Sequence, residues 1–126
     1  MADQIPQIFV GHVGIQGTSV RPLFRVPSGF GGITITKAYL NNGAAATFTA
    51  YLDDLGTALG TAQATGGTLG TSTVANGTFV ANVQKALSLV SNPYVNEGHW
   101  LGLYVSAGAS VEDTEIVIEY MYGRNA

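Results

Sequence analysis

The stretch TEIVIEYMY, residues 114–122, decides the fold class of this chain. Its side chains alternate in character, as they do in a β-strand whose residues point to opposite faces of a sheet. One face carries Ile116, Ile118, Tyr120 and Tyr122. Glu115 and Glu119 mark the other face, yet both faces also carry apolar residues. This composition predicts a central strand or a strand in contact with another subunit.

The same alternation of apolar and polar residues, with a period of two, is found in several earlier segments of the chain. Clear strands are predicted at 33–40, 47–53 and 99–106, and weaker ones at 8–14 and 18–26. Pro22 has no N–H to donate, so the strand at 18–26 is expected at a sheet edge or begins after the proline. The segment 79–90 fits a helix as well as a strand. Because its neighbours are strands, we expect a strand, bulged near Lys85.

Turn-forming residues separate these segments, at 27–32, 41–44, 91–93, 96–98 and 106–110. Seven or eight short strands separated by such turns are typical of an antiparallel β-sandwich or barrel. No glycine-rich helix start follows a strand, which argues against a parallel α/β fold. The sequence therefore predicts one all-β domain over residues 1–126.

The segment 55–78 contains no charge and no aromatic ring, and it is rich in glycine and threonine. Glycine at this density disfavours both helix and regular strand through its backbone entropy. We expect a long loop, with a short strand around Thr57–Ala62, that lies against another neutral protein surface.

Charge is scarce throughout the chain. Charged residues are 10% of the sequence, against about 25% in ordinary domains. The neutral surface fits either a protein covered by other subunits or a protein with a plain neutral exterior. A net charge of −3 with five basic residues argues against nucleic acid. No apolar run is long enough to span a membrane, and the lack of cysteine excludes disulfides. Residues 1–10 have no basic region and no long apolar run, so we expect no secretory signal.

The residues that could carry chemistry are few. His12 and His99 lie on different predicted strands, and Glu97 beside His99 forms the most tempting metal-binding group. The pair Asp53–Asp54 is expected in a solvated turn, and Glu112–Glu115 in a charged turn that leads into a strand, although carboxylates can bind calcium. No nucleophile motif or phosphate-binding loop is present. We expect no metal, no cofactor and no enzyme activity.

Three aromatic residues fall on the polar sides of their strands: Tyr51, Trp100 and Tyr104. Three interpretations of these rings remain open. They complete the core, they are buried against a neighbouring subunit, or they stack on sugar rings.

Two segments carry a family resemblance. YVNEGHWLGLYVSAG (94–108) contains a V-x-x-G turn followed by alternating apolar residues, similar to a hairpin of many viral and bacteriophage jelly rolls. IVIEYMYGRNA (116–126) looks like the last strand of such a sandwich. Together with the leader MADQIPQ and the glycine–threonine middle, the chain resembles small bacteriophage virion proteins, especially jelly-roll head decoration (cement) proteins.

This resemblance implies a homo-oligomer, often a trimer, made in the host cytoplasm and seated on the capsid exterior. There it would bridge neighbouring major capsid proteins, with several modest contacts per oligomer. Residues 1–8 would form an N-terminal arm. Its apolar contacts would come from Ile5, Pro6, Ile8 and Phe9. The alternative is that Ile8 and Phe9 begin the first core strand.

Two other functions stay open. One is a carbohydrate- or receptor-binding β-sandwich, free or at a fibre tip, that uses the aromatic residues. The other is a different head or tail component of the virion, which would share both the fold and the composition.

Overall fold

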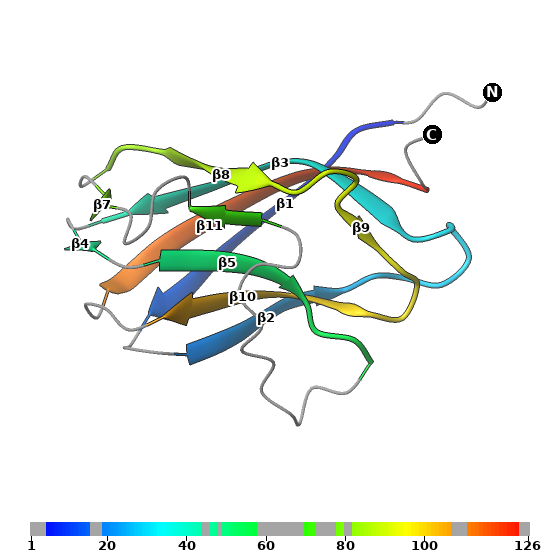
Figure 1. Ribbon diagram of the computed structural model, residues 1–126, viewed down its shortest axis with the longest axis horizontal. Coiled ribbons are helices and arrows are strands. Elements are labelled where there is room, and N and C mark those ends of the chain that lie inside the picture. Colours follow the sequence, from blue (N-terminus) through cyan, green and yellow to red (C-terminus); the bar gives the residue numbers. More distant parts are fainter. Residues whose placement is uncertain are drawn as a thin grey trace.

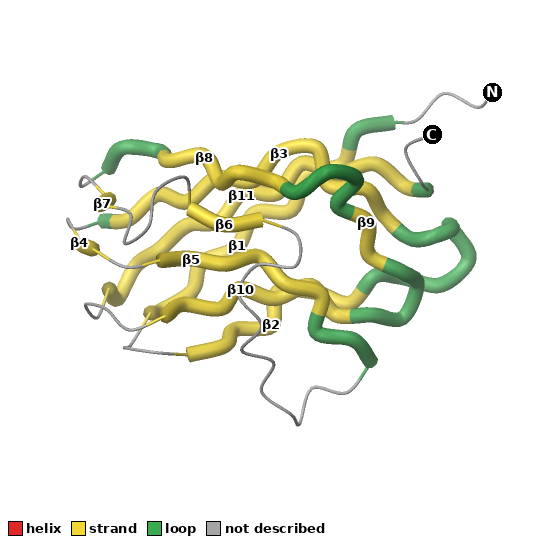
Figure 2. The backbone as a smooth tube through the Cα atoms, in the orientation of Figure 1, coloured by secondary structure: helices red, strands yellow, loops and turns green. Residues whose placement is uncertain are grey.

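The computed structural model is an antiparallel β-sandwich (Figure 1). It describes residues 5–15, 19–43, 46–47, 49–57, 70–72, 78–79, 82–106 and 111–123. Strands and loops account for all of these residues, and none of them is helical (Figure 2). The all-β prediction is confirmed.

The described residues form eleven strands. In chain order they are β1 Gln7–Ile15, β2 Ser19–Arg25, β3 Ile33–Asn42, β4 Ala46–Thr47, β5 Thr49–Asp54, β6 Gly70–Ser72, β7 Thr78–Phe79, β8 Lys85–Leu89, β9 Tyr94–Val95, β10 Trp100–Ser106 and β11 Val111–Tyr122.

Eight of these strands follow one hydrogen-bonded order, β1-β11-β3-β8-β6-β5-β10-β2. The first four form one layer and the last four form the other (Figure 1). β8 joins the layers, since its first residues pair with β3 and Leu87–Leu89 pair with β6. β9 adds to the end of β3, and β4 pairs with β7 in a separate ribbon.

The core lies between the two layers and follows directly from the alternation in the sequence. Ile116 and Ile118 on β11 face Leu101 and Leu103 on β10, and all four side chains are fully buried. The other residues of this buried apolar cluster come from both layers: Val26, Ile33, Ile35, Ala38, Leu40, Ala50, Leu52, Leu87 and Val95. Removing this apolar area from water is the main term that stabilises the sandwich.

The two layers meet a second time at β1 and β2, the two ends of the strand order. Here aromatic rings replace backbone pairing. Phe9 on β1 packs on Phe24 of β2 with ring centroids 4.8 Å apart, and Phe24 stacks on Tyr120 of β11 at 5.5 Å. One side of the sandwich is therefore closed by hydrogen bonds through β8, and the other by these three rings.

Several predictions for individual strands can be compared with the structure. β11 lies between β1 and β3, so its expected central position is confirmed. β2 is an edge strand, as Pro22 indicated, and its register shifts near that residue. The ambiguous segment 79–90 contains a strand, β8, which begins only at Lys85 after Asn82 turns the chain with a positive φ of 60°.

The segment 55–78, expected to be a long loop with a short strand around Thr57–Ala62, contains a strand at a position that was not predicted. Gly70–Ser72 form β6, which pairs with Tyr51 and Leu52 on one side and with Leu87–Leu89 on the other. The two flanking strands provide the hydrogen bonds that this short glycine–threonine segment cannot provide for itself. The short strand expected around Thr57–Ala62 lies largely outside the described residues, and Thr57 itself is a bend.

Candidate functional site

The exposed face of β1 carries an apolar row. Ile8 is 64% exposed and Val10 is 54% exposed, and Ile5 just before the strand is also exposed. The neighbouring residue Phe9 points the other way, into the aromatic contact with Phe24. Among the four residues assigned to an arm, Ile5 and Pro6 precede β1, whereas Ile8 and Phe9 lie within it.

The apolar row continues across the sheet. Val10 is paired with Val117 on β11, and Val117 is paired with Tyr39 on β3. Directly paired residues share a face, so these side chains lie side by side on the outer surface of the first layer. We call Ile8, Val10, Val117 and Tyr39 the outer apolar row. Glu119 and Lys37, which are also paired with each other, lie beside it.

A polar pocket lies at the end of the same face. Three polar residues lie side by side across neighbouring strands, since His12 on β1 pairs with Glu115 on β11, and Glu115 pairs with Asn41 on β3. Together with Asn42, Gly43 and Asn82 they line a cavity of about 140 Å³. His12 Nε2 lies 3.7 Å from Glu115 Oε2.

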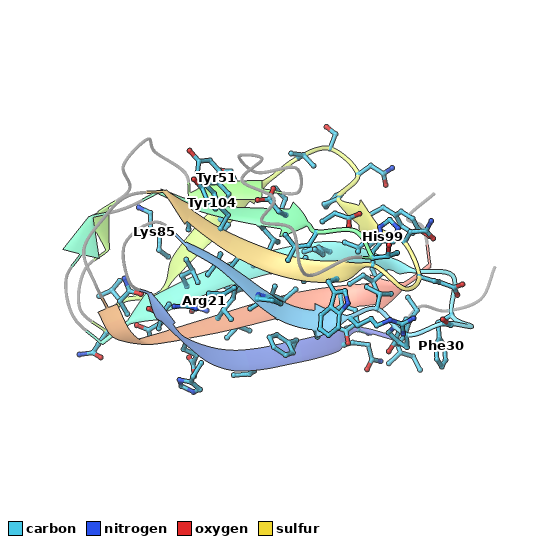
Figure 3. All side chains as sticks on the ribbon, turned by 90° about the horizontal axis from the view of Figure 1, so that it is seen from below. Arg21, Phe30, Tyr51, Lys85, His99 and Tyr104 are labelled. Atoms are coloured by element: carbon cyan, nitrogen blue, oxygen red, sulfur yellow. The ribbon has the colours of Figure 1, made fainter. Side chains whose placement is uncertain are left out.

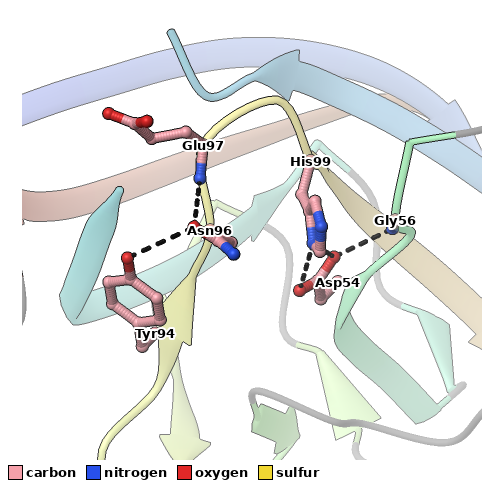
Figure 4. Close-up of polar contacts among 6 residues, drawn as sticks. All are labelled: Asp54, Gly56, Tyr94, Asn96, Glu97 and His99. Atoms are coloured by element: carbon pink, nitrogen blue, oxygen red, sulfur yellow. Dashed lines mark hydrogen bonds and ion pairs between the residues drawn. The ribbon is translucent and has the colours of Figure 1, made fainter. Parts of the chain in front are cut away.

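His99 lies at the other end of the sandwich. Its Nδ1 is 3.0 Å from both carboxylate oxygens of Asp54, which also accepts a 2.8 Å hydrogen bond from Gly56 N (Figure 4). β9, which ends four residues before His99, pairs with Ile33 at the start of β3. His12 lies level with Asn41 near the end of β3, about 25 Å away along an extended strand. The two histidines are therefore not brought together, and within the described ranges no three His, Cys, Asp or Glu residues cluster to hold a metal ion.

Glu97 binds backbone amides. Its Oε2 accepts hydrogen bonds from Gly31 N at 2.6 Å and Gly29 N at 2.8 Å. These two bonds lower the pKa of the Glu97 carboxyl below its ordinary value, Gly31 having the larger effect. The loop that Glu97 holds presents Phe30, which is 57% exposed and packs on Tyr122 at 4.7 Å.

The other acidic residues also have structural places. Asp53 is fully buried on β5, so its expected position in a solvated turn is wrong. Glu112 and Asp113 were expected in a charged turn leading into the strand at 114–122, but both belong to β11. The charged residues indicated that the strand begins at Thr114, but pairing with β1 extends it back to Val111. Thr114 is buried there and donates a 2.9 Å hydrogen bond to Asn42 Oδ1.

The three surface aromatics lie on the outer face of the second layer. Tyr51 and Tyr104 are paired residues whose rings stack at 5.6 Å, and Figure 3 shows them side by side. Trp100 shares that face of β10 and is half-buried. Between Trp100 and Tyr104, the side chain of Leu55 packs over Gly102. The aromatics therefore form a pair and a separate ring, not one continuous platform.

Residues that sequence reasoning missed dominate the polar pocket. Asn41 and Asn42 were assigned to a turn, but both lie in β3, and Asn42 is fully buried. Val10 and Phe30 were also missed, although the expected strand at 8–14 places Val10 on the same face as Ile8.

The fold and these surfaces define a compact antiparallel β-sandwich with a polar pocket at one end. No family model, curated protein or solved structure matches the chain. Among the described residues, the structure offers no helix with the length and apolarity needed to cross a bilayer.

Proposed function

We propose that this chain is a non-enzymatic structural protein of a virion, most concretely a homotrimeric decoration protein that binds the outside of an assembled capsid. The observation that carries the proposal is the outer apolar row, because Ile8 and Val10 remain more than half exposed in a chain with few charges. Such side chains gain stability when another protein covers them.

The energy available fits a role in assembly. Burying one Ile or Val side chain contributes roughly 1.5–3 kcal/mol, so a single row gives a weak contact. Each subunit of an oligomer presents one copy of the row. Several rows that bind at the same time raise the overall affinity of the oligomer for its partner without any new type of contact. In this proposal one copy of the row binds a second subunit or the major capsid protein. Ile5 and Pro6, just before β1, extend the same contact.

The connectivity supports the virion assignment. We infer a jelly-roll winding, in which the layers β1-β11-β3-β8 and β2-β10-β5-β6 arise from two interleaved Greek keys. Along these eight strands the chain changes layer at every step except that between β5 and β6, as that winding requires. Viral capsid domains are among the proteins built in this way.

The acidic residues support a role without catalysis. Glu97 accepts two backbone hydrogen bonds, and Asp54 is shared between Gly56 and His99. Both carboxylates therefore fix loops at one end of the sandwich.

The native mass tests the proposal first. Light scattering behind size exclusion, across a dilution series, should give a trimer whose mass does not change with concentration. Val10→Asp introduces a charge into the outer apolar row and should shift the mass toward the monomer. Ser91→Asp adds the same charge at an exposed bend and should leave the trimer intact. A monomeric wild-type chain would remove the main support for this function.

Attachment is the second test. The trimer should co-sediment with assembled heads of the virus whose genome encodes the chain, and Val10→Asp should not. If the trimer fails to bind heads, a different head or tail component becomes the better assignment.

One observation favours a second candidate, a carbohydrate- or receptor-binding module. Tyr51 and Tyr104 present a stacked pair on the outer face of the second layer. Stacking of a sugar on this pair would quench tyrosine fluorescence in a saturable way, and Tyr104→Ala would abolish the effect.

A further inference from the structure

β1 has one open edge. This strand, Gln7–Ile15, lies at one end of the strand order, and its neighbour within the first layer is β11. Among the described residues, no strand pairs with its other side. Alternate backbone N–H and C=O groups of β1 therefore point away from the sheet, where they can bond a further extended chain.

The open edge of β1 lacks the features that protect sheet edges. Such edges are usually blunted by charged residues, by proline or by a bulge. β2, at the opposite end of the order, has all three, since Arg21 and Pro22 lie beside a shift in its register. Over Gln7–Val13, β1 pairs with β11 without a shift and contains no Pro, Lys, Arg, Asp or Glu. The edge of β1 therefore suits pairing with another strand, whereas the edge of β2 resists it.

We propose that the occupant of this edge is β1 of a second copy of the chain, bound antiparallel about a twofold axis between the two Val10 residues. The first layers of the two copies then form one continuous sheet, as in strand addition. A twofold contact cannot build a trimer, so this contact goes beyond the proposed function. It joins subunits of two neighbouring trimers.

The twofold axis restricts the register of this pairing. Residues directly opposite each other in an antiparallel pair share a face and a hydrogen-bonding direction. Two identical strands therefore place each residue opposite one whose number differs from its own by an even amount. Pairing Val10 with Val10 is the one such register that covers the whole described segment 5–15. It places Ile8 of one copy opposite His12 of the other.

The side chains of β1 are compatible with this register. On the outer face Val10 meets Val10 at the axis, and Ile8 meets His12, so no like charges lie opposite each other. On the inner face Phe9 of one copy lies opposite Gly11 of the other. The ring of Phe9 leans over Gly11 of its own strand, where a Cβ would come within 2.9 Å of it. Gly11 therefore leaves room for the two Phe9 rings to lie against each other.

The pairing also joins the outer apolar rows of the two copies. Tyr39, Val117 and Val10 lie side by side across β3, β11 and β1. When Val10 of one copy lies opposite Val10 of the other, the same face continues through the second copy. The two rows become one band of double the length, which a capsid surface can cover at once. This consequence rests on the proposed function, whereas the pairing itself does not.

A single pair of strands is a weak contact in dilute solution. Even a hairpin, whose two strands are linked by a turn, is marginally stable by itself in water. The dilute trimer should therefore keep its mass. Pairing should become significant where copies are held close together, as they are on a lattice. The test must accordingly trap pairs that form transiently.

Cysteine crosslinking provides such a trap, because the chain has no cysteine of its own. The Cα atoms of directly opposite residues lie about 4.5–5.5 Å apart, within the roughly 4.4–6.8 Å that a disulfide spans. Full-length Val10→Cys, mildly oxidised at high concentration, should form a disulfide-linked dimer. Val83→Cys is the matched control, since Val83 is 53% exposed and Val10 is 54% exposed. We expect Val10→Cys to crosslink at least about tenfold faster, because pairing holds the two sulfurs at a high effective concentration.

Two further variants test the register and leave Val10 in place. Ile8→Cys mixed with His12→Cys should form a mixed disulfide. Neither of these variants should crosslink with itself faster than Val83→Cys does, because the proposed register separates identical residues on either side of the axis. Each variant is first checked for the wild-type pattern of amide resonances.

The proposal is overturned if Val10→Cys crosslinks no faster than Val83→Cys, or if Ile8→Cys links to itself as fast as to His12→Cys. It is also overturned if assembled heads protect the β1 amides from hydrogen exchange while no crosslink forms between copies, because the occupant is then a strand of the capsid protein. The native mass of the wild-type chain reports the trimer separately. A monomer would count against the proposed function, and fast crosslinking at Val10 would still support the pairing.

Discussion

The carboxylate of Glu97 and the backbone N–H of Gly31 are joined by a hydrogen bond of 2.6 Å across 66 positions of sequence. The same oxygen holds Gly29, and the Tyr94 hydroxyl donates a 2.7 Å bond to Gly31 O. One acidic side chain and one phenol therefore fix the loop that carries the exposed Phe30. The charged Glu97 carboxylate is thus one of the contacts that order this end of the molecule.

We expect this loop to loosen in acid. The pKa of Glu97 is lowered in the folded chain, first by Gly31 and then by Gly29, so its contribution to stability is complete above the ordinary pKa of a glutamate. That contribution is lost as the pH falls through the lowered value. An acid titration followed by the amide resonances of Gly29 and Gly31 should show both moving together, with a midpoint below the ordinary glutamate range.

A pair of variants separates Glu97 from other acids. Glu97→Gln should abolish that acid transition and speed hydrogen exchange at Gly29 and Gly31 at neutral pH, because a neutral amide oxygen is a weaker acceptor. Glu119→Gln, on the outer face of β11, should leave both amides unchanged. A transition that persists in Glu97→Gln would show that another group holds the loop.

Gly102 is predicted to tolerate no side chain while Leu55 is present. A Cβ at Gly102 would collide with Leu55 Cδ1 and Cγ, and Leu55 is held there by a 2.8 Å hydrogen bond from its N to Trp100 O. Gly102→Ala should therefore lower the free energy of unfolding by about 1–3 kcal/mol, as overpacking does. Urea unfolding measures the change.

A double-mutant cycle gives the matched control for that collision. Leu55→Ala removes the obstructing side chain at its own cost, so Gly102→Ala should be far less destabilising in the Leu55→Ala background. If the two effects add within about 0.5 kcal/mol, the two residues do not interact as the packing indicates.

The aromatic contact between β1 and β2 should be important for stability. Phe24 packs on both Phe9 and Tyr120, and this cluster closes the side of the sandwich opposite β8. We expect Phe24→Ala to cost about 2–3 kcal/mol in urea unfolding, below the range for a fully buried ring. Phe30→Ala removes the same side chain from an exposed site and should cost about 0.5–1.5 kcal/mol. Equal losses in the two variants would contradict this role for the cluster.

Alternation in the sequence predicted the strands that bury a full face. Ile116 and Ile118, like Leu101 and Leu103, recur at every second position and are fully buried. Pro22 correctly indicated an edge strand, since only a strand at the end of the order accommodates a missing donor. These features are local, and their physical cause can be read within one segment.

Features that depend on distant partners could not be predicted. β6 consists of Gly70, Thr71 and Ser72, which have no hydrophobic period, and it is a strand because β5 and β8 flank it. The direction of Phe9 depends on Phe24, and the buried state of Asn42 depends on Thr114, seventy-two positions away. The polar pocket needs the register of three strands at once, so the Asn-Asn-Gly stretch alone indicated only a turn.

The pairing of β1 with β11 has a consequence for synthesis. Gln7 lies opposite Tyr120, and β11 fills the position between β1 and β3. Until residues 111–122 have left the ribosome, β1 has no neighbour in its layer, and Ile116 and Ile118 are missing from the centre of the core. β1 cannot pair within its layer until β11 has been made, and we expect this long-range pairing to slow folding.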